Sequence, residues 1–335
     1  MRPLRIGVLS LAHLHAAGYL ALLSGRPDVE VAVSDPDAAT RPAGESGGRE
    51  FAEQLGVGRY FDTHQELLDW GPDGVIVCSE NSRHRELTEL AAAAGAHVLC
   101  EKPMATTVAD GEAMIAACAA AGVHLMVAYP VRFSRQFRAL QATLPALGRV
   151  VAAAGTNNGQ LPGGRSWFSD AELAGGGAVM DHTVHLADLL DCLLSGAEAE
   201  SVHAVTNRMI RGDDVEVETG GLVSLSYPGG LIATIDCSWS VPQHYPTWGG
   251  LTLRLFGEDG IADMDAFGQA VHGFRASTRG PLRFDFGEGG DGPMLEEFVT
   301  AIREGRRPQP DGESGLRSLR VVERAYESAR TGVPA

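Results

Sequence analysis

Three residues in the sequence have types and spacings that suit proton transfer at a hydroxyl group. Asp181 and His185 are four positions apart in a helical pattern, so both side chains project from one face of that helix. There the carboxylate can orient the imidazole, a group whose ordinary pKa suits it to accept a proton. Lys102 follows a short apolar run and would supply a cation that stabilises a developing alkoxide. A lone helical histidine is more often structural, so the prediction depends on the pairing with Asp181.

The chain around Lys102 alternates between short apolar runs and longer helical patterns. This alternation is typical of a parallel sheet with helical crossovers, and it places Lys102 at the carboxyl end of a strand, where open α/β sheets bind ligands. We therefore predict a doubly wound Rossmann domain over residues 1–130, with a surface loop at 36–48. The predicted strands are residues 4–9, 29–33, 74–78, 97–100 and 124–127, and the predicted helices are 14–23, 83–94 and 108–121.

Beyond residue 131 the sequence changes to strand-like runs around one strong helix at 180–194. Residues 222–227 and 231–238 flank Pro228-Gly229-Gly230, which predicts an antiparallel hairpin. We predict an α+β domain with an open, mainly antiparallel sheet over 131–310, and a last helix in 311–335 that packs back on the first domain. Further strands are predicted at 150–154, 202–208 and 251–256, and closing helices at 295–302 and 316–329.

The turn after the first predicted strand lacks the glycines of a dinucleotide-binding loop. Such loops read G-x-G-x-x-G, which permits a tight turn and close approach of the backbone to a pyrophosphate. Here the turn is Ser10-Leu11-Ala12-His13-Leu14-His15, with all three glycines replaced. By position we expect Ser10, Leu11, Ala12 and His13 to contact a cofactor, although the turn alone leaves cofactor binding open.

Asp35 is the residue that would choose between nicotinamide cofactors. It follows the second predicted strand, about 20 residues after the turn, where a carboxylate accepts hydrogen bonds from the ribose hydroxyls. A carboxylate there favours NAD and disfavours the extra phosphate of NADP. The alternative, with equal weight, is a plain turn residue within Ser34-Asp35-Pro36-Asp37.

A series of motifs follows in order along nearly the whole chain. They are Ser79-Glu80-Asn81-Ser82-Arg83-His84, the stretch from Ala94 that ends in Glu101-Lys102-Pro103, VAYPVRF at 127–133, GGGAVMDHTVHLAD at 175–188, and the tail at 298–305 with Gly315-Leu316. Together they resemble the Gfo/Idh/MocA family of oxidoreductases (glucose-fructose oxidoreductase, inositol dehydrogenase and relatives). The E-K-P and D-x-x-x-H elements are the most specific part of this resemblance.

The resemblance implies an enzyme that transfers a hydride between a nicotinamide cofactor and a hydroxyl or keto carbon of a sugar, polyol or cyclitol. It places Lys102, Asp181 and His185 in the catalytic constellation, with His185 as the base. For Arg132 an ion pair is an equal alternative to substrate contact. Trp167 could line a substrate pocket, although aromatic residues at such positions are more often core. The further cofactor-binding positions are Ser79, Asn81, His84, Glu101 and Lys102, and the substrate positions are Arg132, Trp167 and His182.

Other functions stay open at this level. A non-catalytic nucleotide- or sugar-binding sensor fits the degenerate turn, and a lyase or hydrolase would use transient oxidation by tightly held NAD. Asp181, His182 and His185, with His13 or His15, have residue types that bind zinc. We expect no metal, because the spacing fixes no third ligand and His182 should point away from Asp181 on a regular helix.

Composition excludes several classes. The chain has 335 residues, 44% of them hydrophobic, and a formal net charge of −16, which argues against a nucleic-acid surface. The five cysteines form no C-x-x-C pair, which favours reduced thiols and a cytoplasmic protein. Histidines interrupt the apolar N-terminal run, so we expect neither export nor membrane insertion. An open sheet favours a homodimer or homotetramer.

Overall fold

The computed structural model describes residues 2–245, 247–275, 280–285 and 289–335, and it divides the chain into two compact units. The first unit comprises Met1–Tyr129, Pro162–Gly175 and Asp291–Leu319, and the second comprises Pro130–Leu161, Gly176–Gly290 and Arg320–Ala335. Two segments that are distant in sequence therefore fold with the N-terminal residues. Helix α10 (Gly312–Thr331) contributes its first residues to one unit and its remainder to the other.

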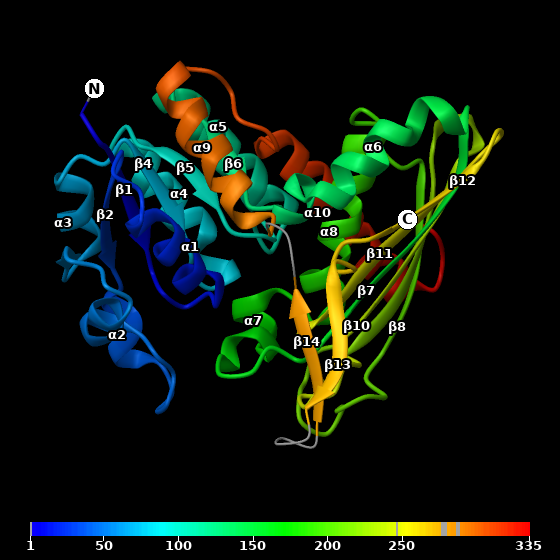
Figure 1. The fold of residues 1–335 in the computed structure, drawn as a ribbon, viewed down its shortest axis with the longest axis horizontal. Helices are drawn as coiled ribbons and strands as arrows, with labels where there is room; N and C mark the ends of the chain where they lie inside the picture. Colours follow the sequence, from blue (N-terminus) through cyan, green and yellow to red (C-terminus); the bar gives the residue numbers. More distant parts are fainter. Residues whose placement is uncertain (1, 246, 276–279, 286–288) are drawn as a thin grey trace. The chain divides into compact units, whose positions relative to one another are not determined.

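The first unit is built on a six-stranded, fully parallel sheet, which confirms the predicted Rossmann fold (Figure 1). Its strand order is β3-β2-β1-β4-β5-β6, so the order reverses between β1 and β4, the point at which doubly wound sheets bind ligands at the carboxyl ends of their strands. Ile6 and Val8 of β1 are fully buried because helices cover both faces of the sheet. The strands are β1 (Leu4–Leu9), β2 (Val29–Ser34), β3 (Tyr60–Phe61), β4 (Gly74–Val77), β5 (His97–Cys100) and β6 (Leu125–Val127).

Helices α3, α5 and α7 of this unit begin at residues whose side chains cap them. Thr107 accepts a hydrogen bond from the Asp110 N–H at the start of α5, and Thr63 forms a capping box with Glu66 at the start of α3. The predicted loop at 36–48 is partly wrong, because Pro36–Thr40 forms a 3-10 helix, η1, and α2 begins at Gly48. The α-helices are α1 (His15–Ser24), α2 (Gly48–Gln54), α3 (His64–Asp69), α4 (His84–Ala93), α5 (Val108–Ala121), α7 (Ala171–Ala174) and α9 (Asp291–Glu304).

The second unit is an open sheet of order β12-β11-β7-β10-β9-β8. It is mainly antiparallel, as predicted, with one parallel pair between β7 and β10, and the predicted hairpin is β9 paired with β10. A separate hairpin joins β13 (Ala270–Arg275) to β14 (Gly280–Asp285). The strands are β7 (Val150–Gly159), β8 (Ser201–Asn207), β9 (Gly220–Ser226), β10 (Ile232–Ser238), β11 (Gly249–Gly257) and β12 (Ile261–Asp265), and the α-helices are α6 (Arg135–Leu147) and α8 (Ala178–Leu193).

One face of this sheet is covered by α8, which packs on β7, β9 and β10. Gly155 on β7 permits the close approach, since a Cβ there would lie 2.7 Å from Leu186 Cδ2. The other face carries exposed apolar side chains, among them Val205, Leu222 and Ile232, which are 56%, 46% and 59% exposed. An open sheet is the feature from which the sequence predicted an oligomer.

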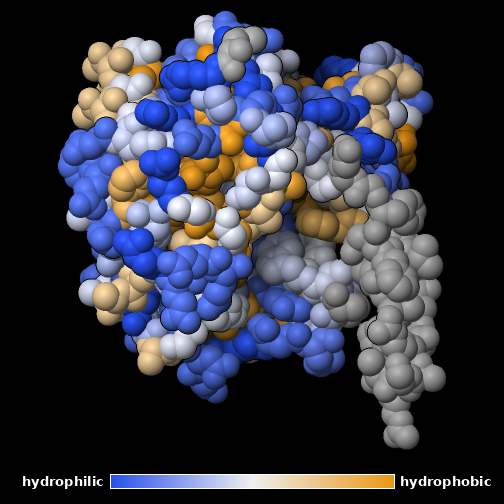
Figure 2. All heavy atoms as spheres, turned by 60° about the vertical axis from the view of Figure 1, so that its left-hand side comes forward, coloured by the Kyte–Doolittle hydropathy of each residue, from blue (hydrophilic) through white to orange (hydrophobic). Residues whose placement is uncertain are grey.

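Surface and thiol properties agree with the composition. Hydrophilic side chains cover most of the molecular face drawn in Figure 2. Among the described residues, no helix combines the length and the apolar character that spanning a bilayer requires. All five cysteines are free thiols, and four of them are buried.

Candidate active site

The turn after β1 has the backbone shape of a glycine turn although it contains no glycine. Ser10 has a φ of +70°, a left-handed conformation that costs a non-glycine residue about 1–2 kcal/mol. Its hydroxyl compensates by accepting a hydrogen bond from Ala12 N at 3.2 Å and donating one to Asp35 Oδ1 at 3.3 Å. Serine can therefore replace the first glycine here because its side chain bonds within the turn.

Most backbone N–H groups of this turn are already bonded within the protein. Leu11 N donates to Asp35 Oδ1 at 3.0 Å, and His13 N donates to Cys78 O at 2.8 Å. His15 N donates to the Nδ1 atom of His13 at 3.2 Å, which caps the start of α1. These N–H groups are the ones that a glycine loop would offer to a pyrophosphate, and here they are already bonded within the protein.

A second segment of the same unit holds the turn from outside. Arg165 donates from Nε to Ala12 O at 2.9 Å and from Nη2 to Leu11 O at 3.2 Å. Trp167 donates from Nε1 to Ala12 O at 3.1 Å and stacks on Phe168, with ring centroids 3.8 Å apart. Trp167, a predicted substrate position, lies against the turn after β1, because the segment at 162–175 folds with the first unit. Its contact with substrate stays a prediction.

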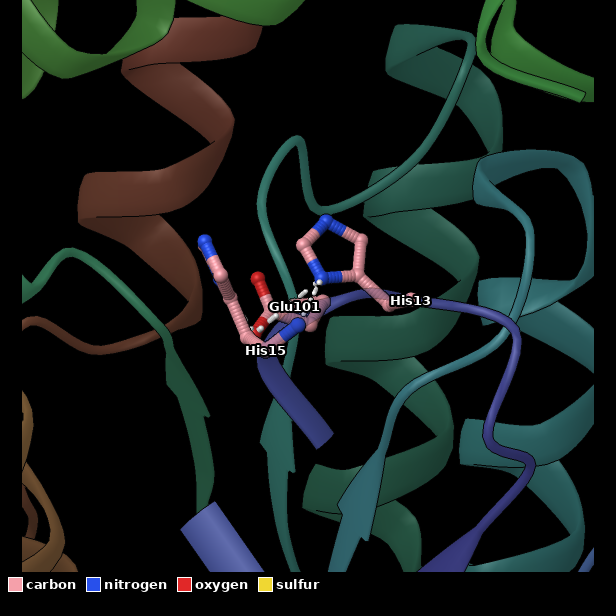
Figure 3. Close-up of side chains that lie close together, drawn as sticks. All are labelled: His13, His15 and Glu101. Atoms are coloured by element: carbon pink, nitrogen blue, oxygen red, sulfur yellow. Dashed lines mark hydrogen bonds and ion pairs between the residues drawn. The ribbon is translucent and has the colours of Figure 1, made fainter. Parts of the chain in front are cut away.

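His13, His15 and Glu101 form a compact cluster beside the turn (Figure 3). His15 Nδ1 lies 3.1 Å from Glu101 Oε1, and His13 Nδ1 lies 3.8 Å from the same oxygen. Burial would raise the pKa of Glu101, but His15 and the Tyr19 hydroxyl lower it, so the carboxylate stays ionised. The three residue types are those of zinc sites, with ligand atoms within 4.8 Å of one another. However, the His13 Nδ1 lone pair already accepts the His15 N–H, so hydrogen bonding accounts for the cluster.

Lys102 follows directly after β5, at the carboxyl edge of the parallel sheet, and is 5% exposed. Its backbone N–H donates to Glu101 Oε2 at 3.1 Å, which ties the lysine to the buried carboxylate. The Lys102–Pro103 bond is cis, and His84 Nδ1 lies 2.9 Å from Pro103 O. Lys102 is also the only lysine in the sequence. Of the 27 lysine and arginine residues, the other 26 are arginines.

Asp35 lies at the end of β2, where the sequence predicted it, and is 1% exposed. Arg41 binds it with both terminal nitrogens, at 2.7 Å to Oδ2 and 2.5 Å to Oδ1, and Gly48 N donates to Oδ2 at 2.7 Å. Burial would raise the pKa of Asp35, but the Arg41 guanidinium and these N–H groups outweigh it and lower the pKa. Ribose hydroxyls would therefore compete with Arg41 for this carboxylate, a partner that sequence reasoning did not identify.

Several buried polar atoms at the carboxyl edge of the first sheet have no hydrogen-bond partner among the residues that the structure describes. They are His13 Nε2, Arg41 Nε, Glu80 Oε2 and Asn81 Oδ1. Buried polar groups in proteins are nearly always bonded, so each of these atoms can take a hydrogen bond from or to a ligand or water. The residues brought together at this edge are Ser10, Leu11, Ala12, His13, Asp35, Ser79, Asn81, His84, Glu101 and Lys102, which are all the cofactor positions that we predicted.

The second unit carries the other predicted residues on α8. Asp181 and His185 are buried, at 7% and 9% exposure, and Trp239 Nε1 donates to Asp181 Oδ2 at 3.1 Å. The expectation that His182 points away from Asp181 is wrong, because His182 Nε2 lies 3.1 Å from Asp181 Oδ2. Both residues lie in the first turn of α8, where His182 Nδ1 is 2.9 Å from Asn157 O and is drawn toward the sheet.

Arg132 is held by an ion pair rather than left open to solvent. Its guanidinium donates to both Asp188 carboxylate oxygens, at 3.0 and 2.5 Å, and lies 3.5 Å from Asp191 Oδ2. Burial would lower the pKa of Arg132, but Asp188 raises it, so the charge is retained. This arrangement supports the structural alternative for Arg132 over its predicted contact with substrate.

The start of α8 is anchored by residues that the sequence did not reveal. Glu218 Oε1 accepts hydrogen bonds from Gly177 N at 2.9 Å, Val179 N at 3.0 Å and the Tyr326 hydroxyl at 2.8 Å. A carboxylate at a helix N-terminus bonds free N–H groups and opposes the helix dipole. Glu218 is about 40 positions from the helix, so spacing within the sequence could not reveal it.

Replacing Glu218 by alanine is expected to lower the free energy of unfolding by about 1–3 kcal/mol, because two N–H groups lose their acceptor. Urea denaturation followed by circular dichroism measures this. Glu216, two positions earlier and exposed, gives a matched control whose change to alanine should stay within about 0.5 kcal/mol. Equal effects of the two substitutions would show that Glu218 does not anchor α8.

Comparison with known proteins gives the family. Residues 25–129 match the model of the oxidoreductase family with an NAD-binding Rossmann fold (Gfo/Idh/MocA), and residues 139–263 match the GFO/IDH/MocA C-terminal domain. The first match begins after the glycine-free turn. Together the two matches cover more than half of the chain, which belongs to the Gfo/Idh/MocA family, as the sequence motifs predicted.

Relatives named as enzymes are similar to this chain over most of their length. The chain is 31% identical over 305 residues to a 1,5-anhydro-D-fructose reductase from Ensifer adhaerens, covering 86% of this chain and 87% of that protein. It is 28% identical to a myo-inositol 2-dehydrogenase from Thermotoga maritima, covering 94% and 93%. An aldose-aldose oxidoreductase from Caulobacter crescentus, solved with glycerol, has 30% identity and a TM-score of 0.80, covering 100% and 99%.

A further solved structure, GenD2 from gentamicin A biosynthesis in complex with NAD, has a TM-score of 0.88 at 24% identity, covering 100% of this chain and 96% of that one, and shows the shared fold. The predicted class is confirmed: the chain is an NAD(P)-dependent oxidoreductase of the type that acts on CH–OH groups of sugars and polyols. The non-catalytic alternative has no support among these relatives, which are named reductases and dehydrogenases.

Proposed function

We propose that this enzyme interconverts a secondary hydroxyl and a ketone on a sugar, polyol or cyclitol, with NAD as the preferred cofactor. Lys102, Asp181 and His185 act on the reacting hydroxyl. The observation that carries the proposal is the only lysine of the chain, fixed beside a buried carboxylate at the carboxyl edge of a Rossmann sheet. The bound nicotinamide accepts or supplies the hydride.

The protein's own groups handle the proton and the charge. In the oxidative direction His185 accepts the hydroxyl proton, a contribution of about 10²–10⁴-fold for general base catalysis. The ammonium of Lys102 stabilises the alkoxide that forms before the C–H bond breaks. Asp181, fixed by Trp239, orients the imidazole or shares the substrate hydroxyl with it. Proton release, alkoxide stabilisation and hydride loss thus occur on one carbon and its oxygen.

The nucleotide is assigned to the carboxyl edge of the first sheet. Asp35 would accept hydrogen bonds from the ribose hydroxyls. The segments that contain Ser79, Asn81 and Glu101 line the same edge. The unpartnered polar atoms gathered there support this assignment. Arg41, beside Asp35, offers a cation to a 2′-phosphate, so we expect a preference for NAD that is moderate rather than absolute.

A thermal-shift titration with NAD⁺, NADH, NADP⁺ and NADPH tests this proposal. Ligand at 100 times its dissociation constant should add about 2.7 kcal/mol of stability, a shift of a few degrees for a chain of this length. A larger shift with NAD(H) than with NADP(H) is expected. The absence of any shift, in protein shown to carry no bound nucleotide, would contradict the enzyme proposal.

The substitution Arg41→Ala should increase the preference for NAD over NADP. It removes the cation that a 2′-phosphate would use, so the Kd for NADP⁺ is expected to rise about 10- to 100-fold, while NAD⁺ binding is kept or strengthened. Arg49→Ala is the control, since Arg49 bonds to Asp62 on the surface. Isothermal titration measures both, and parallel losses for the two cofactors would contradict the role of Arg41.

We also propose a homo-oligomer formed through the open face of the second sheet, in the cytoplasm. Exposed Val205, Leu222 and Ile232 on that face support the first point, and five unpaired thiols support the second. Light scattering of the purified protein measures the assembly directly.

A further inference from the structure

We propose that the Nε2–H group of His13 holds the pyrophosphate of the cofactor, in place of the backbone N–H groups that a glycine loop would provide. This inference rests on the proposed nicotinamide function and deepens it. It concerns the feature in which this chain departs most from a dinucleotide-binding loop. Three observations lead to it: the position of the imidazole proton, the burial of Nε2, and the place of His13 in the fold.

The position of the proton follows from the hydrogen bonds. A backbone N–H is always a donor, so the His13 Nδ1 atom that receives the His15 N–H at 3.2 Å carries a lone pair. Burial lowers the pKa of His13 well below its usual value, so the ring is neutral. The proton of His13 must therefore be on Nε2. For the same reason the 3.8 Å approach of Nδ1 to Glu101 Oε1 is not an ion pair.

The Nε2–H donor is buried and lacks an acceptor. His13 is 2% exposed, and Nε2 has no hydrogen-bond partner within the described part of the chain. Figure 3 shows this nitrogen on the side of the ring that faces away from Glu101 and His15. The ring lies 5.4 Å from Phe168 and 6.0 Å from Trp167, centroid to centroid, so aromatic residues border it and offer no strong acceptor. A polar ligand is needed to satisfy this group.

The place of His13 indicates which ligand. His13 lies between the carboxyl end of β1 and the start of α1, where dinucleotide folds hold a pyrophosphate. The turn's own N–H groups are occupied, as described above, whereas Nε2–H is available. Lys102 and Arg41 contribute positive charge at the same edge of the sheet. A neutral histidine thus supplies a directed donor where the glycines have been lost.

Two substitutions separate the two nitrogens of His13. In His13→Asn the amide oxygen replaces Nδ1 as the cap of α1, but nothing reaches the position of Nε2. In His13→Gln the amide nitrogen reaches the position of Nε2, but the cap is lost. We expect His13→Asn to keep the melting temperature and to raise the Kd for NAD⁺ about 10- to 100-fold. His13→Gln should lose stability and keep most of the affinity. His124→Asn, at the start of another strand, is the control.

Isothermal titration with fragments identifies the acceptor. NAD⁺ and ADP-ribose contain the pyrophosphate, and AMP does not, so the loss in His13→Asn should appear for the first two and be absent for AMP. In ¹⁵N-histidine spectra the Nε2–H signal of His13 should move on adding ADP-ribose. Equal affinity of His13→Asn and the unmodified protein for NAD⁺ would overturn the inference alone. Failure of the unmodified protein to bind any dinucleotide would overturn the proposed function as well, so the two failures are distinguishable.

Discussion

Replacing Lys102 by methionine is expected to lower kcat by at least about 10²–10³-fold, the usual cost of removing a group that stabilises an oxyanion. Methionine reproduces the buried lysine side chain as far as Cε and lacks its ammonium, so the fold and the melting temperature should be kept. The steady-state rate of NAD⁺ reduction, measured with a polyol that the unmodified enzyme oxidises, gives kcat. Isothermal titration checks that nucleotide binding persists. Unchanged turnover in Lys102→Met would contradict the proposed role.

Lys102→Arg is the sharper control, because all the remaining lysine or arginine positions of the chain are arginines. If only positive charge were needed at this site, arginine would serve, and Lys102→Arg would retain most of its activity. We expect it to be nearly as inactive as Lys102→Met, since a planar guanidinium cannot replace a compact ammonium at a single oxygen. Because no other side chain is a lysine, an amine-selective reagent should also inactivate the enzyme by modifying Lys102, and cofactor should protect it.

Replacing His185 by asparagine is expected to lower kcat about 10²–10⁴-fold, the range that general base catalysis contributes. The pH profile is the more specific measurement. In the unmodified enzyme kcat/KM for alcohol oxidation should rise with pH as the base loses its proton, and in His185→Asn this limb should be lost.

His182→Asn provides the matched comparison for His185, because both histidines lie on α8 and are buried. His182 contacts Asn157 O and Asp181, so its substitution should change KM and stability while the ascending limb of the pH profile remains. If His182→Asn rather than His185→Asn removes that limb, the base has been assigned to the wrong histidine.

The fold was largely predictable because its elements have strong local signals. Buried parallel strands such as β1 and β4 need continuous apolar runs, and the helices between them are long enough to show a period. β3, with two residues, and α3, with six, are too short for either pattern. The return of residues 162–175 to the first unit also had no signal in the sequence, because it depends on long-range contacts such as Arg165 to Ala12.

For the site, too, features with a local signal could be predicted from the sequence, whereas long-range contacts could not. Positions that come directly after a strand, such as Asp35 and Lys102, could be placed from the sequence because strand ends share one edge of a parallel sheet. Their partners could not: Arg41 reaches Asp35 from a surface segment, and Glu218 reaches α8 from a different strand region. The turn was read as defective because glycine was expected; the structure shows a serine in the left-handed conformation, stabilised by its own hydroxyl.

Transfer of deuterium from substrate to cofactor tests the central claim most directly. The enzyme is supplied with NAD⁺ and a panel of sugars, polyols and cyclitols deuterated at their carbinol carbons, and the nicotinamide product is analysed by mass spectrometry. The account predicts reduced nucleotide that carries one deuterium, formed by the unmodified enzyme and not by Lys102→Met. If the protein binds NAD⁺ but forms no labelled nucleotide with any member of the panel, the assignment of hydride transfer at a carbohydrate-type CH–OH group is contradicted.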